Sequence, residues 1–159
     1  MQTIIKKAGA AAMLAAMVSL SPVTAQAQED ESHTEDAELA TPMSQLQTFA
    51  HKLALSIEAE NGELAGFYLH EIEETAESII DEIPEYEGLA IGPLVGSMLM
   101  PQVERLEEAL EPGDWQAAAA VFGDIVNSCN ACHQATEHGF IVIEYRPGEN
   151  PFMQSFAPR

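Results

Sequence analysis

The pattern of apolar positions along the chain predicts a series of helices. Between residues 42 and 57, apolar side chains recur at steps of three and four, the spacing that places them on one face of a helix. This first stripe consists of Met43, Leu46, Phe49, Ala50, Leu53 and Ile57. Thr41 suits the N-cap and Pro42 the first helical position, while Asn61-Gly62 should end the segment.

Two further stripes follow. The second covers residues 64 to 83 and stops before Pro84, because the residue that precedes a proline avoids helical backbone. The third covers residues 93 to 110, and Pro101 should kink or split it. No internal repeat or alternation of strands and helices is visible, so both segments favour a purely helical fold.

A fourth stripe begins after Asp114, a good N-cap residue. Its members are Trp115, Ala118, Ala119, Phe122, Ile125, Val126, Cys129, Cys132 and His133. Four helices of similar length with short connections predict an all-α fold, an antiparallel four-helix bundle with a short extended C-terminal tail. The fourth stripe continues into two cysteines and a histidine, so candidate chemistry lies near its end.

The segment Cys129-Asn130-Ala131-Cys132-His133 has the Cys-x-x-Cys-His spacing at which c-type haem is attached. On a helix, residues i, i+3 and i+4 share one face, so both thiols and the imidazole can reach one porphyrin. We expect Cys129 and Cys132 to form thioethers with the haem vinyl groups and His133 to be an axial iron ligand. The sequence thus predicts one covalent haem c and uses both cysteines of the chain.

The N-terminus has the organisation of a secretory signal. Lys6 and Lys7 precede an apolar run over residues 8 to 20, and Ala25-Gln26-Ala27 suits signal peptidase. A retained membrane anchor is the alternative, but the run is shorter than the roughly 20 residues of a spanning helix. We expect residues 1–27 to be removed and the mature protein to be periplasmic, where covalent haem attachment takes place.

The distribution of charged residues separates an acidic leader from a folded domain in the mature chain, and the net charge indicates which partners the protein attracts. Residues 28–41 are acidic and contain one large apolar residue, which predicts a disordered leader before a haem-binding domain over residues 42–159. Without the two signal lysines, four basic residues stand against 26 acidic ones, a formal charge of −22. Such a protein is repelled by nucleic acid and anionic membranes and attracted to a basic docking face; solubility alone is the other interpretation.

A helical bundle whose last helix carries Cys129 to His133 near its C-terminal end resembles the class II c-type cytochromes, the cytochrome c prime group. The resemblance covers residues 42 to 137 in architecture, and the tail from about residue 138 is similar to a less-characterised single-haem subgroup. It implies one-electron transfer with a redox partner protein. The alternative is a five-coordinate haem that binds or scavenges small gases such as nitric oxide, and a homodimer is left open.

The sixth iron position decides between these two functions. Met43 is the best-placed candidate, because the end of the fourth helix should lie beside the start of the first, although it suits the core equally well. His51 lies at the boundary of its stripe and suits the role less. Met153 reaches the iron only if the tail folds back. A vacant position screened by Leu46 or Phe49 is the remaining alternative.

Residues beyond the motif add to the candidate site. Arg146 matches a haem propionate, since a guanidinium pairs with a carboxylate through two hydrogen bonds, or it is a simple surface arginine. Residues 141–143, Phe152 and Phe156 suit a flap over an apolar surface, either the haem edge or the bundle.

Other chemistries fit less well. A peroxidase requires a distal acid–base group, for which only His51 is available. A thioredoxin-like Cys-x-x-Cys opens a helix, whereas this one closes a helix. A zinc site requires further ligands, and His138 is the nearest. We therefore expect an electron carrier or haem-binding protein and not an enzyme.

Overall fold

The structure, a computed structural model, describes residues 29–145, 148 and 150–159, with side chains from residue 39 onwards. Within this part of the chain it is all-helical and has no strands. The helices are α1 (Glu29–Glu58), α2 (Gly62–Glu82), α3 (Ile91–Met98), α4 (Met100–Leu110) and α5 (Trp115–Ala135). Because α3 and α4 form one broken element, these are the four helical elements of the predicted all-α fold, which is confirmed.

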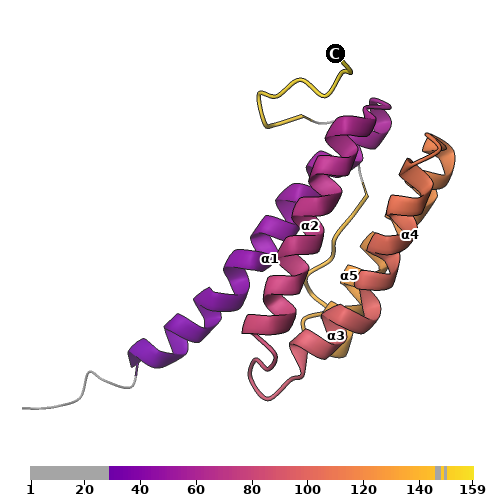
Figure 1. Cartoon of the computed structure of the whole chain (residues 1–159). Helices are drawn as coiled ribbons and strands as arrows, with labels where there is room; N and C mark the ends of the chain where they lie inside the picture. Colours follow the sequence, from indigo (N-terminus) through magenta and orange to yellow (C-terminus); the bar gives the residue numbers. More distant parts are fainter. Residues whose placement is uncertain (1–28, 146–147, 149) are drawn as a thin grey trace, which may run out of the picture.

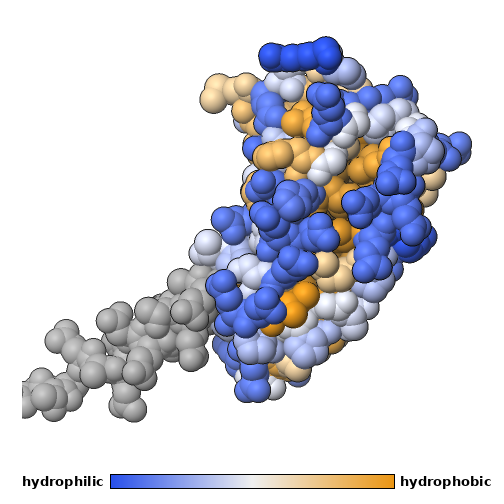
Figure 2. Space-filling view, in the orientation of Figure 1, coloured by the Kyte–Doolittle hydropathy of each residue, from blue (hydrophilic) through white to orange (hydrophobic). Residues whose placement is uncertain are grey.

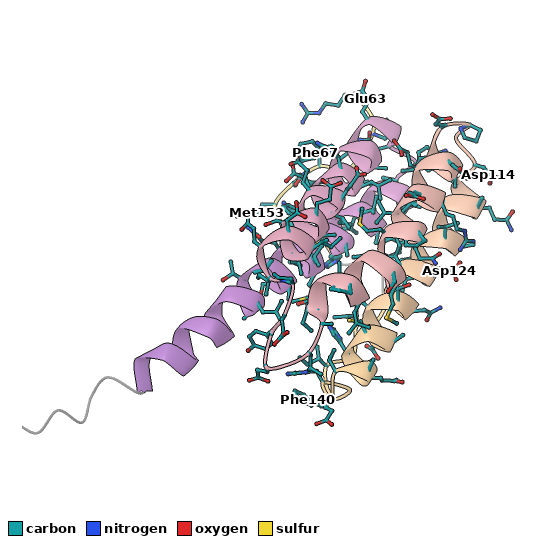
Figure 3. The ribbon with its side chains drawn as sticks, turned by 60° about the horizontal axis from the view of Figure 1, so that its bottom comes forward. Glu63, Phe67, Asp114, Asp124, Phe140 and Met153 are labelled. Atoms are coloured by element: carbon teal, nitrogen blue, oxygen red, sulfur yellow. The ribbon has the colours of Figure 1, made fainter. Side chains whose placement is uncertain are left out.

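The helices surround one apolar core. Contacts join α1 to α2, α2 to α3 and α4, α4 to α5, and α5 back to α1. The α1–α2 and α4–α5 connections lie at one end of the molecule, and the α2–α3 connection lies at the other with the end of α5 (Figure 1). In Figure 3, Glu63 and Asp114 mark the first end and Phe140 the second. The candidate motif therefore lies at the end opposite the α1–α2 connection.

Local capping chemistry sets the helix boundaries. Asn61 Oδ1 accepts a hydrogen bond of 3.2 Å from the Leu64 amide, and Asp114 Oδ1 accepts one of 3.0 Å from the Ala117 amide. Each bond satisfies an amide that has no partner inside its helix. Pro101 lies in the first turn of α4, where its missing N–H costs nothing. The breaks predicted at Asn61 and Pro101 and the start after Asp114 are confirmed.

The beginning of α1 differs from the prediction. Helical backbone starts at Glu29, so Thr41 is not the N-cap, and residues 29–40 are helical where a disordered leader is expected. Glutamate, a strong helix former, occupies four of these twelve positions, and acidic residues favour a helix N-terminus. Local propensity thus carries α1 past Pro42 and beyond the other helices (Figure 1). The predicted signal, residues 1–27, lies outside the described residues.

Buried apolar side chains from all the helices fill the core. The largest fully buried side chains are Leu53, Ile72, Ile79, Leu106, Ile125 and Ser56. The Ser56 hydroxyl donates to the Lys52 carbonyl at 2.8 Å, so its burial leaves no polar group unpaired. Apolar residues reach the surface as a narrow band between hydrophilic ones (Figure 2). No helix in the described part of the chain has the length and apolar character that crossing a membrane requires.

Gly92 brings α3 close against the end of α2. A Cβ atom at this position would lie 2.9 Å from the Ile80 carbonyl oxygen and 3.1 Å from Pro84 Cα, both shorter than normal contacts with backbone atoms. The Gly92 amide also donates to the Pro84 carbonyl at 3.2 Å. The turn between α2 and α3 therefore requires glycine, which fixes α3 beside the end of α5 that carries the motif (Figure 1).

The C-terminal tail, residues 136–159, folds back on the bundle. It runs in the direction opposite to α5, because Asn130 contacts Ile143 while the earlier Phe122 contacts the later Tyr145, with ring centroids 5.0 Å apart. The tail ends over the α1–α2 hairpin, where Phe156 is buried with 7% of its surface exposed. The tail thus connects the motif end of the molecule to the opposite end.

Candidate haem-attachment site

The helix α5 places the three motif side chains on one face. It continues without a break through Cys129, Cys132 and His133 to its C-cap at Thr136. The Thr136 hydroxyl donates to the Cys132 carbonyl at 3.0 Å and so completes the last turn. Cys129 packs against the core and both cysteines are free thiols of intermediate exposure. The backbone therefore presents two thiols and an imidazole together, as the spacing predicts.

The environment of the cysteines favours uncharged sulfur. Burial raises the pKa of the Cys129 thiol from 9.0 to about 11, and the neighbouring Cys132 adds to the increase. Burial also raises the pKa of Cys132. Catalytic and redox-active cysteines have the opposite property, a lowered pKa that yields a thiolate. The site is thus suited to neutral thiols or thioethers and unsuited to thiol–disulfide exchange.

The imidazole of His133 is oriented by the tail. Its Nδ1 lies 2.9 Å from the carbonyl oxygen of Ile141. A carbonyl oxygen can only accept, so this bond requires the proton on Nδ1 and leaves the lone pair of Nε2 for another partner. Histidines that bind metals have this arrangement, with the second nitrogen held by a carbonyl or carboxylate. The sequence gives no signal for it, because the partner is a backbone atom.

Asn130, between the two cysteines, binds the tail through both ends of its amide. Its Nδ2 donates to the Ile143 carbonyl at 2.8 Å, and its Oδ1 accepts from the Ile143 amide at 2.7 Å. This two-point contact fixes the backbone of Ile143 on α5. The role of Asn130 is not predicted from the sequence, although an amide side chain inside the motif and an extended run from residue 141 are both visible there.

Three observations show that these residues fit a haem. The two thiols and the imidazole share a face, the thiols are uncharged, and His133 keeps Nε2 available. Large apolar side chains also lie exposed just beyond α5: Phe140 (79% exposed), Val142 (64%) and Ile141 (43%). Figure 3 shows Phe140 beyond the end of this helix. An apolar macrocycle beside the motif would find apolar neighbours there.

Two hollows of about 510 and 540 Å³ lie along α1 and between α2 and the end of the tail. No motif residue lines either of these two hollows. The described residues contain no group of three His, Cys, Asp or Glu side chains placed to hold a metal ion, the grouping that the zinc alternative requires.

The candidates for the sixth position are distributed over α1 and the tail. Met43 and Leu46 lie on α1, partly buried against the core, and Phe49 stacks on a ring of α2. The His51 ring packs edge-on against Phe152 of the tail, with centroids 5.1 Å apart. Met153 is fully exposed, although the tail does fold back, and it points outward (Figure 3).

The other predicted residues lie as follows. Arg146 is outside the described residues. The His138 Nδ1 pairs with the Thr136 carbonyl at 2.7 Å, so this ring is engaged within its own turn. Phe152 and Phe156 pack on the α1–α2 hairpin, away from the motif end. These two phenylalanines therefore cover the bundle, as one of the two interpretations of the predicted flap requires.

Comparison with known proteins identifies no relative: no family model, no curated protein and no solved structure matches the chain.

Proposed function

We propose that this chain is a periplasmic monohaem c-type cytochrome of the class II kind, built as an antiparallel four-helix bundle. Cys129 and Cys132 attach the haem covalently and His133 is its axial ligand. The observation that carries the proposal is the geometry of the motif: both thiols and the imidazole lie on one face of α5, and the Ile141 carbonyl engages His133 Nδ1, which leaves the lone pair of Nε2 for a ligand.

The bound haem would supply an iron that takes up and releases one electron. The residues of the chain bind this group and hold it in position. Cys129 and Cys132 fix the position of the group relative to α5, and His133 fixes the direction of its axial bond. The packed core keeps the helices in place as the charge changes. The large negative charge of the chain attracts a redox partner with a basic docking face.

Gas binding is the second candidate function. The α1 helix offers Met43, which can bind iron, and also Leu46 and Phe49, which cannot. A six-coordinate spectrum that carbon monoxide leaves unchanged supports electron transfer. A high-spin spectrum with uptake of carbon monoxide and nitric oxide by the reduced protein supports gas binding.

The covalent attachment is tested by replacing both cysteines. We expect the exported chain to keep its haem after denaturation and the variant Cys129→Ala/Cys132→Ala to lose all of it, because both thioether bonds are removed. Haem staining of a denaturing gel and the intact mass measure this. Asn127→Ala changes an exposed residue of the same helix and should retain the haem. An exported wild-type chain without covalent haem contradicts the proposal.

A further inference from the structure

We infer that Asn130 is a positioning residue for His133: by binding the Ile143 peptide it presents the Ile141 carbonyl to Nδ1. The inference rests on the proposed function, since it concerns the residue that would hold the iron. It assigns a role to one of the two variable positions of the motif.

The contacts form one continuous path from Asn130 to His133. Both residues lie on α5, three positions apart and therefore on one face. Their partners, Ile143 and Ile141, lie two positions apart on the tail, and the bonds of 2.8, 2.7 and 2.9 Å show that both face α5. Three residues of helix rise about 4.5 Å and two residues of extended chain span about 6.6 Å, so both contacts can form together.

Burial of apolar side chains contributes little to fixing residues 141–143 of the tail on α5. Ile141 and Val142 are 43% and 64% exposed, and only Ile143 packs partly against the core. The Ile141 amide bonds back to the His138 carbonyl at 2.8 Å, a contact within the tail that does not join it to α5. Polar contacts from α5 therefore contribute to holding residues 141–143, and the Asn130 side chain makes two of them.

Fixing the Ile141 carbonyl has two consequences for His133. The bond sets which nitrogen carries the proton and how the ring is turned. Donation from Nδ1 also makes Nε2 a more basic ligand, which stabilises oxidised iron and lowers the reduction potential. Asn130 thus acts on the iron through Ile143 and Ile141 without contacting it.

The test compares the full-length haem protein with two variants and one control. Asn130→Ala and Asn130→Leu both remove the amide, and leucine keeps a similar volume, so an effect common to both comes from the lost hydrogen bonds. Asn127→Ala, on the exposed face one turn earlier, is the control.

All four proteins should carry covalent haem. In both Asn130 variants we expect exchange of the Ile143 amide to accelerate by about tenfold and the reduction potential to rise. Unchanged exchange, or a potential that stays or falls, overturns the inference.

A further readout separates this inference from the proposed function. If the wild-type protein carries no haem, the proposed function fails, and nitrogen chemical shifts of the His133 ring still measure its tautomer. We expect a single Nδ1-protonated form in the wild type and a mixture in both Asn130 variants. A mixture in the wild type, or no change in the variants, refutes the role of Asn130 independently of haem.

Discussion

The two halves of α5 are held in different ways. Residues 115–126 contribute buried apolar side chains to the core: Ala118, Val121, Phe122, Ile125 and Val126. Residues 127–135 contribute no fully buried side chain and are joined to the tail by hydrogen bonds from Asn130 and His133. One helix therefore provides stability in its first half and reactive groups in its second. Substitutions should separate the two properties.

The largest expected difference in stability is at Ile125, which is 1% exposed. Ile125→Ala removes buried methyl groups and leaves a cavity, so it should lower the free energy of unfolding by about 2–5 kcal/mol. Ile141→Ala, at a side chain that is 43% exposed beside the motif, should change it by about 0.5 kcal/mol or less. Chemical denaturation of both variants measures the comparison. Equal losses would show that apolar burial does not distinguish the first half of α5 from the tail segment beside its second half.

The thiols of the haem-free protein should show how burial decreases along the second half of α5. With its pKa near 11 instead of 9.0, Cys129 should react with iodoacetamide about a hundredfold more slowly than an unperturbed thiol below pH 9, because far less of it is thiolate. Burial alone raises the pKa of Cys132, whereas a second cause adds to the increase at Cys129. Cys132 should therefore react faster than Cys129. The raised pKa of Cys129 stabilises the fold below pH 9, and this contribution is lost as the pH rises through 11.

Peptide mapping after timed alkylation distinguishes the two cysteines. Cys129→Ala is the matched control for the reaction of Cys132 alone. Faster modification of Cys129 than of Cys132 would contradict the assigned burial.

A smaller effect is expected where the tail meets the first hairpin. Phe156 is 7% exposed and its carbonyl accepts a hydrogen bond of 3.0 Å from Asn61, whereas Phe140 is 79% exposed. Phe156→Ala should lower the free energy of unfolding by about 2 kcal/mol, less than the roughly 3–5 kcal/mol usual for a buried aromatic, because the chain end can rearrange to fill the space. Phe140→Ala should have almost no effect. Thermal unfolding of the pair checks this, and equal melting temperatures contradict it.

The sequence predicts those parts of the fold that depend on local chemistry. The break at Asn61, the cap at Asp114 and the break at Pro101 follow from groups within a few residues of each helix end. The shared face of the motif follows from its spacing alone. The start of α1 differs from the prediction, because a stretch with few apolar residues can still be helical through the propensity of its own residues.

The remaining features depend on contacts between distant parts of the chain. Phe156 is buried by a hairpin that precedes it by nearly the whole domain, and no periodic pattern marks a single buried residue in an irregular segment. The partner of His133 is a backbone carbonyl, which any residue type provides. Such contacts become visible only when the path of the tail is known.

That path also has a consequence for the order of folding. Asn61 bonds to Phe156 across 95 residues of chain and Tyr68 to Gln154 across 86, whereas neighbouring helices close only short loops. Because closing a long loop costs more entropy, the helices assemble before the tail closes over them. During that interval the bundle is formed, and the Asn61 amide nitrogen and the Tyr68 hydroxyl still lack their partners in the tail. The α1–α2 hairpin is therefore the part of the bundle that is covered last.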